Sequence, residues 1–253
     1  MKLGLRKIGT GKPIVCLSGF GFSSKIFLPL IKHFSQQYQF YLIDLPGFGQ
    51  TPYVPYTTET LLLQLQKIVP NKAIWMGWSL GGTIALSYAL QYPEAVQKLI
   101  LLSTTPKFVA ESDWPGMPEA VFSDFLARGL DDWQKLFRQF VLLQFAPGMV
   151  NKKIYKELSQ SHHHPNLTTG AIEQALSILH NSDLRRQLSH IDCPNLWLTG
   201  DKDQLVSTQT FTSDYFEEKA SLRQTKMIEG AGHILFLSHR DLIQKYIENF
   251  LRG

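Results

Sequence analysis

The chain has 253 residues, of which 44% are hydrophobic and 18% are charged, so its composition excludes a disordered chain and allows a large core. The net charge of +4 is too small to indicate nucleic-acid binding, although a locally positive surface would still attract an acidic partner. Both cysteines, Cys16 and Cys193, lie in apolar stretches, which predicts buried thiols in a reducing compartment rather than disulfides or metal ligands. No apolar run of signal-peptide length follows the first basic residues, so we expect a cytoplasmic protein.

Apolar runs of strand length alternate with longer helical patterns along most of the chain. This alternation predicts an α/β fold with a mostly parallel sheet and helices on both of its faces. In chain order, strands are expected at residues 13–17, 40–44, 73–76, 96–102, 195–199 and 222–228. Helices are expected at residues 26–34, 59–69, 80–91, 208–218 and 240–251.

One uncharged stretch, residues 73–93, is long enough to span a bilayer. Glycines and hydroxyl side chains near its middle, among them Gly77, Ser79 and Gly81, favour a buried strand, a tight turn and a buried helix instead. We therefore expect no membrane segment in this chain.

The alternation is interrupted between residues 107 and 188, where the periodicity is helical and four prolines break it. The simplest arrangement is one α/β core built from residues 1–106 and 189–253. Residues 107–188 are then a helical cap that is inserted between two strands of the core.

A serine motif, Gly77-Trp78-Ser79-Leu80-Gly81, matches the pattern G-x-S-x-G and lies between a predicted strand and a predicted helix. The pattern alone occurs by chance in about one chain in ten of this length, because Gly and Ser are common residues. Its position favours a strained turn that lifts the Ser79 hydroxyl above the sheet edge as a nucleophile. An ordinary turn serine is the alternative.

Two backbone N–H groups are candidates to bind the oxyanion of an acyl-transfer reaction. One belongs to Leu80, directly after the nucleophile, and the other to Phe20, in the glycine-containing loop at residues 18–21 that follows the first predicted strand. A plain glycine turn is the alternative for this loop.

A base must remove the Ser79 proton, and this kind of site requires the chain order Ser, Asp or Glu, His. The predicted strands 195–199 and 222–228 are followed by loops that carry Asp201 and Asp203 in one case and His233 in the other. Because parallel strands end at the same sheet edge, these side chains are expected near Ser79. We favour Asp203 over Asp201 as the acid, and His233 as the base.

Four stretches carry a likeness to a known family. They are residues 71–82 around the nucleophile, Asp44 to Gly49, Asp113 to Gly116 and Asp183 to Arg185. Through them the chain resembles the α/β-hydrolase superfamily, and within it the pimeloyl-acyl-carrier-protein methyl ester esterases of biotin synthesis.

The resemblance implies a triad of Ser79, Asp203 and His233, with oxyanion donors at Phe20 and Leu80 and no metal or organic cofactor. Two positions depart from the family pattern, since Ser18 stands in place of a His and Phe20 in place of a Trp. The implied reaction is hydrolysis of the methyl ester of pimeloyl-acyl-carrier protein. A broad short-chain carboxylesterase, a carbon–carbon bond hydrolase and a non-catalytic binding protein are the rival interpretations.

Substrate contacts are expected from Phe20, Trp78 and Phe140. Between residues 133 and 156 the chain has five basic residues and no acidic one, which predicts a local basic surface for an acidic carrier protein. A solvated helix face is the alternative, and we expect a monomer. The five residues are Lys135, Arg138, Lys152, Lys153 and Lys156. The run His162-His163-His164 is interpreted as a solvated loop rather than a metal site.

Overall fold

The computed structural model describes residues 1–160, 166–216 and 220–253. Within them, seven strands form one sheet in the order β1-β3-β2-β4-β5-β6-β7. Strand β1 is antiparallel to β3, whereas the other neighbouring pairs are parallel. The strands are β1 (Gly4–Ile8), β2 (Lys12–Leu17), β3 (Tyr38–Asp44), β4 (Ala73–Trp78), β5 (Val96–Leu102), β6 (Asn195–Gly200) and β7 (Arg223–Ile228).

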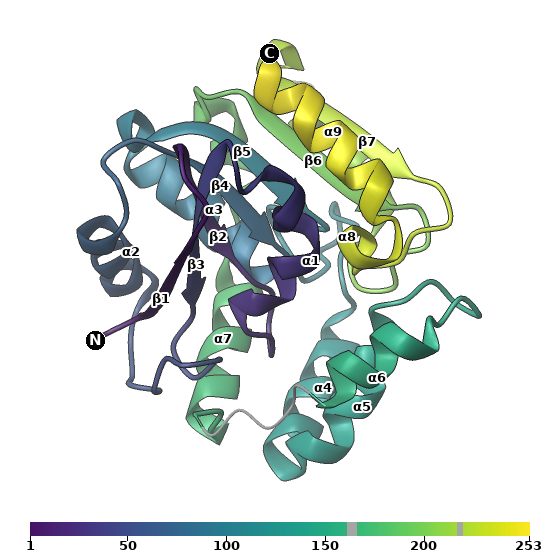
Figure 1. Ribbon diagram of the computed structural model, residues 1–253. Coiled ribbons are helices and arrows are strands. Elements are labelled where there is room, and N and C mark those ends of the chain that lie inside the picture. The colour runs from purple at the N-terminus through teal and green to yellow at the C-terminus, as the bar shows by residue number, and fades with distance from the viewer. Residues whose placement is uncertain (161–165, 217–219) are drawn as a thin grey trace.

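Helices cover both faces of this sheet (Figure 1). Helix α3 packs on β2, β4 and β5, and α2 packs on α3, while α1, α8 and α9 pack together on the opposite face. These helices are α1 (Leu28–Ile31), α2 (Thr58–Ile68), α3 (Leu80–Gln91), α8 (Leu235–Ser238) and α9 (Arg240–Arg252). The arrangement leaves the central strands buried on both sides, as expected for a parallel sheet.

The central strands are formed by continuous apolar runs. Every residue of β4 and of β6 is buried, and α3 after β4 is buried over most of its length. Such runs remove enough apolar surface from water to favour burial at the middle of the sheet. The turn that joins β4 to α3 therefore lies between two buried elements, which hold it rigidly.

Between β5 and β6, the described part of the chain forms four α-helices that gather at one end of the sheet (Figure 1). Helix α4 packs on α5 and α7, α5 packs on α6, and α7 also contacts α3 of the core. They are α4 (Glu119–Asp131), α5 (Trp133–Leu143), α6 (Lys152–Gln160) and α7 (Thr169–Asn181).

The chain enters and leaves this helical segment at one place. Lys107 and Asp183 form an antiparallel bridge, and the N–H of Leu184 donates to the carbonyl of Pro106 at 2.9 Å. The side chain of Arg185 is 9% exposed and binds Asp183 at 2.6 Å, Glu111 at 2.7 Å and Asp113 at 3.3 Å. Hydrogen bonds from Arg185 lower the pKa of Asp183 to about 2. An ion-pair cluster thus joins the two crossing segments.

All six predicted strands are present, and the bounds of β5 and α3 agree with the prediction. Strand β1 was not predicted, because its residues are largely exposed and include Arg6 and Lys7. The predicted helix at 208–218 is wrong over its described residues, which form two short 3₁₀ turns, Thr208–Thr212 and Asp214–Phe216. Hydroxyls of Thr212 and Ser213 bond to nearby carbonyls there and compete with helical hydrogen bonds.

The uncharged stretch at 73–93 forms β4, a turn and α3, as predicted. Among the residues that the structure describes, no helix has both the length and the apolar character needed to cross a membrane.

Candidate active site

Ser79 occupies the turn between β4 and α3 and has the unusual backbone angles φ 53° and ψ −121°. A non-glycine residue with positive φ is strained and persists only where its surroundings hold it. A Cβ added to Gly81 would lie 2.1 Å from the carbonyl oxygen of Leu17, and one added to Gly77 would lie 2.4 Å from Gly82 Cα. The flanking glycines are therefore required by the close approach of α3 to β2 and to the turn.

The loop after β2 lies directly against this turn. A Cβ added to Gly19 would be 3.2 Å from Ser79 Cβ, and the Ser18 hydroxyl donates to the carbonyl of Phe22 at 2.7 Å, which closes the loop. Within the described part of the chain, the backbone N–H groups of Phe20 and Leu80 donate to no protein acceptor. Both amides are thus available to a substrate oxygen.

Asp203 and His233 form a buried pair. Asp203 Oδ2 is 2.8 Å from His233 Nδ1, and their side chains are 0% and 2% exposed. The second Asp203 oxygen accepts the backbone N–H groups of Leu205 at 2.8 Å and Val206 at 3.0 Å. These contacts fix the carboxylate, which in turn holds Nδ1 as the protonated nitrogen and leaves Nε2 as the acceptor.

Asp201 has partners other than His233. Its Oδ1 accepts the N–H of Gly230 at 2.7 Å and its Oδ2 is 3.3 Å from Lys202 Nζ. Asp201 therefore ties the loop after β6 to the loop after β7, whereas Asp203 is the acid that contacts the histidine.

Trp78 lies in a different position from the one expected of a substrate contact. It is 1% exposed, and its indole Nε1 donates to the backbone carbonyl of His233 at 3.0 Å. A second backbone contact, from the N–H of Ile234 to the carbonyl of Gln144 at 2.9 Å, joins the same loop to the end of α5. Sequence reasoning missed the Gln144 contact, since a backbone carbonyl leaves no signal in the residue type.

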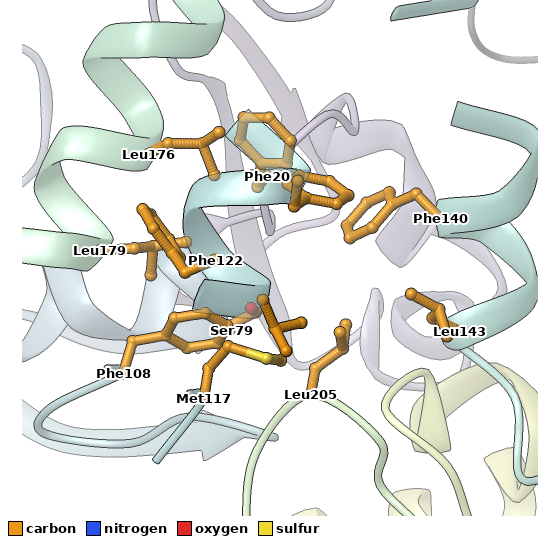
Figure 2. A pocket seen from close by; sticks show the side chains of 12 residues that line it. Phe20, Ser79, Phe108, Met117, Phe122, Phe140, Leu143, Leu176, Leu179 and Leu205 are labelled. Atoms are coloured by element: carbon orange, nitrogen blue, oxygen red, sulfur yellow. The ribbon is translucent and has the colours of Figure 1, made fainter. Parts of the chain in front are cut away.

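A cavity of about 70 Å³ opens beside Ser79, between the sheet edge and the inserted helices. Figure 2 shows the Ser79 hydroxyl as the one oxygen among the labelled side chains, with Phe108 and Met117 on one side and Phe140 and Leu143 on the other. The cavity is lined by Ser79 and by Phe20, Phe108, Met117, Val121, Phe122, Phe125, Phe140, Leu143, Leu176, Leu179 and Leu205. Such a surface suits an alkyl group and gives no partner to a buried charge.

The five basic residues singled out from the sequence are all exposed. Lys135 and Arg138 belong to α5, Lys152, Lys153 and Lys156 belong to α6, and the two helices pack together. The run at residues 162–164 lies outside the described residues. Within residues 1–160, 166–216 and 220–253, no group of His, Cys, Asp and Glu side chains has the arrangement of a metal site.

A strained serine between a parallel strand and a helix, two free backbone amides and an Asp–His pair at the same sheet edge are features of an α/β-hydrolase site. A family model for the alpha/beta hydrolase fold matches residues 12–240, and the chain belongs to this family.

Several proteins are similar over the whole chain. A pimeloyl-[acyl-carrier protein] methyl ester esterase from Legionella pneumophila (strain Corby) is 32% identical over 252 residues, with 100% of both chains covered. An esterase of the same name from Shewanella woodyi is 34% identical and covers 94% of this chain and 93% of its own. Among solved structures, an esterase from Exiguobacterium antarcticum has a TM-score of 0.87 at 24% identity, covering 99% and 96%. A bromoperoxidase from Bacillus anthracis has a TM-score of 0.88 at 20% identity, covering 99% and 95%, so these structures share the fold alone.

Proposed function

We propose that the chain is a serine carboxylesterase that hydrolyses the methyl ester of pimeloyl-acyl-carrier protein through an acyl-enzyme on Ser79. The relatives that bear this activity in their names are about 30% identical over the full length of the chain. The observation that carries the chemistry is the buried 2.8 Å contact between Asp203 and His233, on the loops that follow β6 and β7.

The proposed reaction uses these groups in turn. Ser79 Oγ attacks the ester carbonyl carbon while His233 Nε2 accepts its proton, and the backbone N–H groups of Phe20 and Leu80 bind the oxyanion. His233 then gives the proton to the methoxy group, which leaves as methanol. Water, deprotonated by the same nitrogen, attacks the acyl-enzyme and releases the free carboxylate with Ser79 regenerated.

The apolar cavity beside Ser79 favours a substrate that has an acyl or alkyl group next to its ester. Its lining side chains are apolar apart from Ser79, so an ester carbonyl gains its polar contacts at the serine turn and at the backbone of the loop after β2. Phe20 and Phe140 are the two predicted substrate contacts that line it. A chain that ends in a free carboxylate inside the cavity would lose its hydration without a cation to replace it.

We propose residues 107–188 as the cap, with core segments at 1–106 and 189–253. The Lys107–Asp183 bridge at the crossing point and the helices that close over Ser79 support these bounds. We propose the exposed basic residues of α5 and α6 as the docking surface for the acidic carrier protein, since opposite charges attract and orient an encounter.

We place the enzyme in the cytoplasm and propose that it acts as a monomer on its carrier-bound substrate. Cys16 and Cys193 are both buried and free, which is compatible with a reducing compartment. Burial raises the pKa of the Cys193 thiol to about 12, so this cysteine is chemically inert.

The test compares pimeloyl-carrier methyl ester with p-nitrophenyl acetate and butyrate, using Ser79→Ala as the blank. We expect strong preference for the carrier-bound ester and no turnover by the variant. Turnover of the small esters alone would replace the proposal with a broad short-chain esterase. Full activity of Ser79→Ala would overturn the mechanism.

A further inference from the structure

We propose that Trp78 is a positioning residue that sets the place of the base through its indole N–H. The proposal rests on the proposed function and deepens it. Trp78 is the residue before the nucleophile, and its Nε1 donates to the backbone carbonyl of His233 at 3.0 Å. The last residue of β4, directly before Ser79, therefore holds the main chain of the proposed base with its side chain.

The indole is held in a single orientation. Trp78 is 1% exposed and packs against Phe22 and Phe236, each with ring centroids 5.2 Å away, while the His233 ring lies 5.6 Å away. A Cβ added to Gly19 would lie 3.0 Å from the same indole. Because the ring contacts the oxyanion loop as well as the base, it has no free direction in which to turn.

The loop that carries His233 needs such support. It follows β7, an edge strand whose four middle residues are exposed, so the sheet holds it from one side only. The carboxylate of Asp203 fixes the His233 side chain. The carbonyl of His233 itself accepts the Trp78 indole N–H. Its neighbours in the loop are held at Gly230 by Asp201, at the Ala231 carbonyl by the N–H of Lys202 and at Ile234 by the Gln144 carbonyl at the end of α5. Loss of the indole N–H leaves a buried carbonyl without this donor and lets the imidazole move relative to Ser79.

A merely structural role would make any buried tryptophan of this strand equivalent, and the strand offers that comparison. Trp75 is also on β4, is 0% exposed and stacks on Tyr88 at 4.0 Å. Among the described residues its Nε1 has no hydrogen-bond partner. Trp75 and Trp78 therefore match in residue type, strand and burial, and differ in the hydrogen bond.

The experiment replaces each tryptophan in turn by 3-benzothienylalanine, which keeps the bicyclic shape but has a sulfur atom in place of the N–H. With p-nitrophenyl butyrate, we expect the change at Trp78 to lower kcat about tenfold with KM within about twofold, since a small displacement of a catalytic group is costly. The same change at Trp75 leaves both constants unchanged. Equal kinetics for the two variants would overturn the proposal.

Further measurements separate an effect on catalysis from a loss of folded protein. The rate is divided by the concentration of active sites, which is titrated with a fluorophosphonate. If incorporation of the analogue harms folding, Trp78→Phe and Trp75→Phe give a second matched pair. The low-field proton resonance between His233 Nδ1 and Asp203 Oδ2 is expected to shift in the Trp78 variants alone. Activity that survives in Ser79→Ala would instead mean that the proposed function has failed.

Discussion

Ile234, the residue after His233, donates its backbone N–H to the carbonyl of Gln144 at the end of α5, 2.9 Å away. The loop after β6, which carries Asp203, contacts the same stretch of chain, because Gln204 Nε2 donates to the carbonyl of Phe145 at 3.0 Å. The loops that carry the acid and the base therefore both rest on the stretch that follows α5. We expect a displacement of α5 to reach Asp203 and His233 through these two contacts.

The Gln204 contact gives a first prediction. Gln204→Ala removes a hydrogen bond between the acid loop and the inserted helices, which is worth about 1 kcal/mol. We expect kcat/KM to fall about threefold and hydrogen exchange at residues 145–150 to become faster. Gln209→Ala is the control, since Gln209 is also exposed and follows in the same loop region. Equal exchange in the two variants would contradict the link.

The two acids after β6 can be separated by a matched pair of amides. Asp203→Asn disturbs the tautomer and orientation of His233, and we expect kcat/KM to fall by about 10⁴ with little change in fold. Asp201→Asn weakens the contact to Gly230 and is expected to lower the melting temperature by a few degrees while activity stays within about threefold. A larger kinetic loss from Asp201→Asn would reverse the assignment.

Charge reversal tests the docking surface. We expect Lys152→Glu with Lys156→Glu to raise KM for the carrier-bound ester about tenfold and to weaken its salt dependence, because exposed charges act on encounter. KM for p-nitrophenyl butyrate is expected to stay the same. Lys245→Glu, at an exposed position of α9, is the control and should behave as the wild type. Equal effects of both changes would indicate a general charge effect.

The ion-pair cluster at the crossing point predicts a pH dependence of stability. The pKa of Asp183 is lowered to about 2 from an ordinary value near 4, mainly by hydrogen bonds from Arg185. A lowered folded-state pKa contributes stability that is complete above about pH 4 and is lost as the pH falls toward about 2. We expect urea unfolding to show this loss in the wild type and a smaller one in Arg185→Met.

The Arg185→Met variant is also expected to change the melting temperature at neutral pH. Arg185 has a side chain that is 9% exposed and contacts three carboxylates, so Arg185→Met is expected to lower the melting temperature by about 5 °C. Arg252→Met removes an exposed pair with Glu248 and should change it by less than about 1 °C. Similar melting temperatures for the two variants would show that the Arg185 ion-pair cluster contributes little to the stability of the fold.

Much of the fold follows from local patterns. The continuous apolar runs of β4 and β6 identify buried strands, because such segments have no stable position at the surface. Strand β1 was not predicted, because its residues are exposed or half-buried and form no continuous apolar run. The helix expected at 208–218 shows the opposite error, in which hydroxyl side chains compete for carbonyls and shorten the helix to 3₁₀ turns.

Motif spacing and the common edge of parallel strands are local or topological properties. The amino-acid sequence was therefore enough to predict six of the strands in the described sheet and the residues on which the proposed chemistry depends. It favoured Asp203 over Asp201 as the acid but kept Asp201 as an alternative, and it suggested a substrate contact for Trp78. The contact of Asp203 with His233 and that of the Trp78 indole with the His233 carbonyl became visible only in the folded chain. Those contacts join residues 30 and 155 positions apart, and their geometry depends on how separate strands and loops pack.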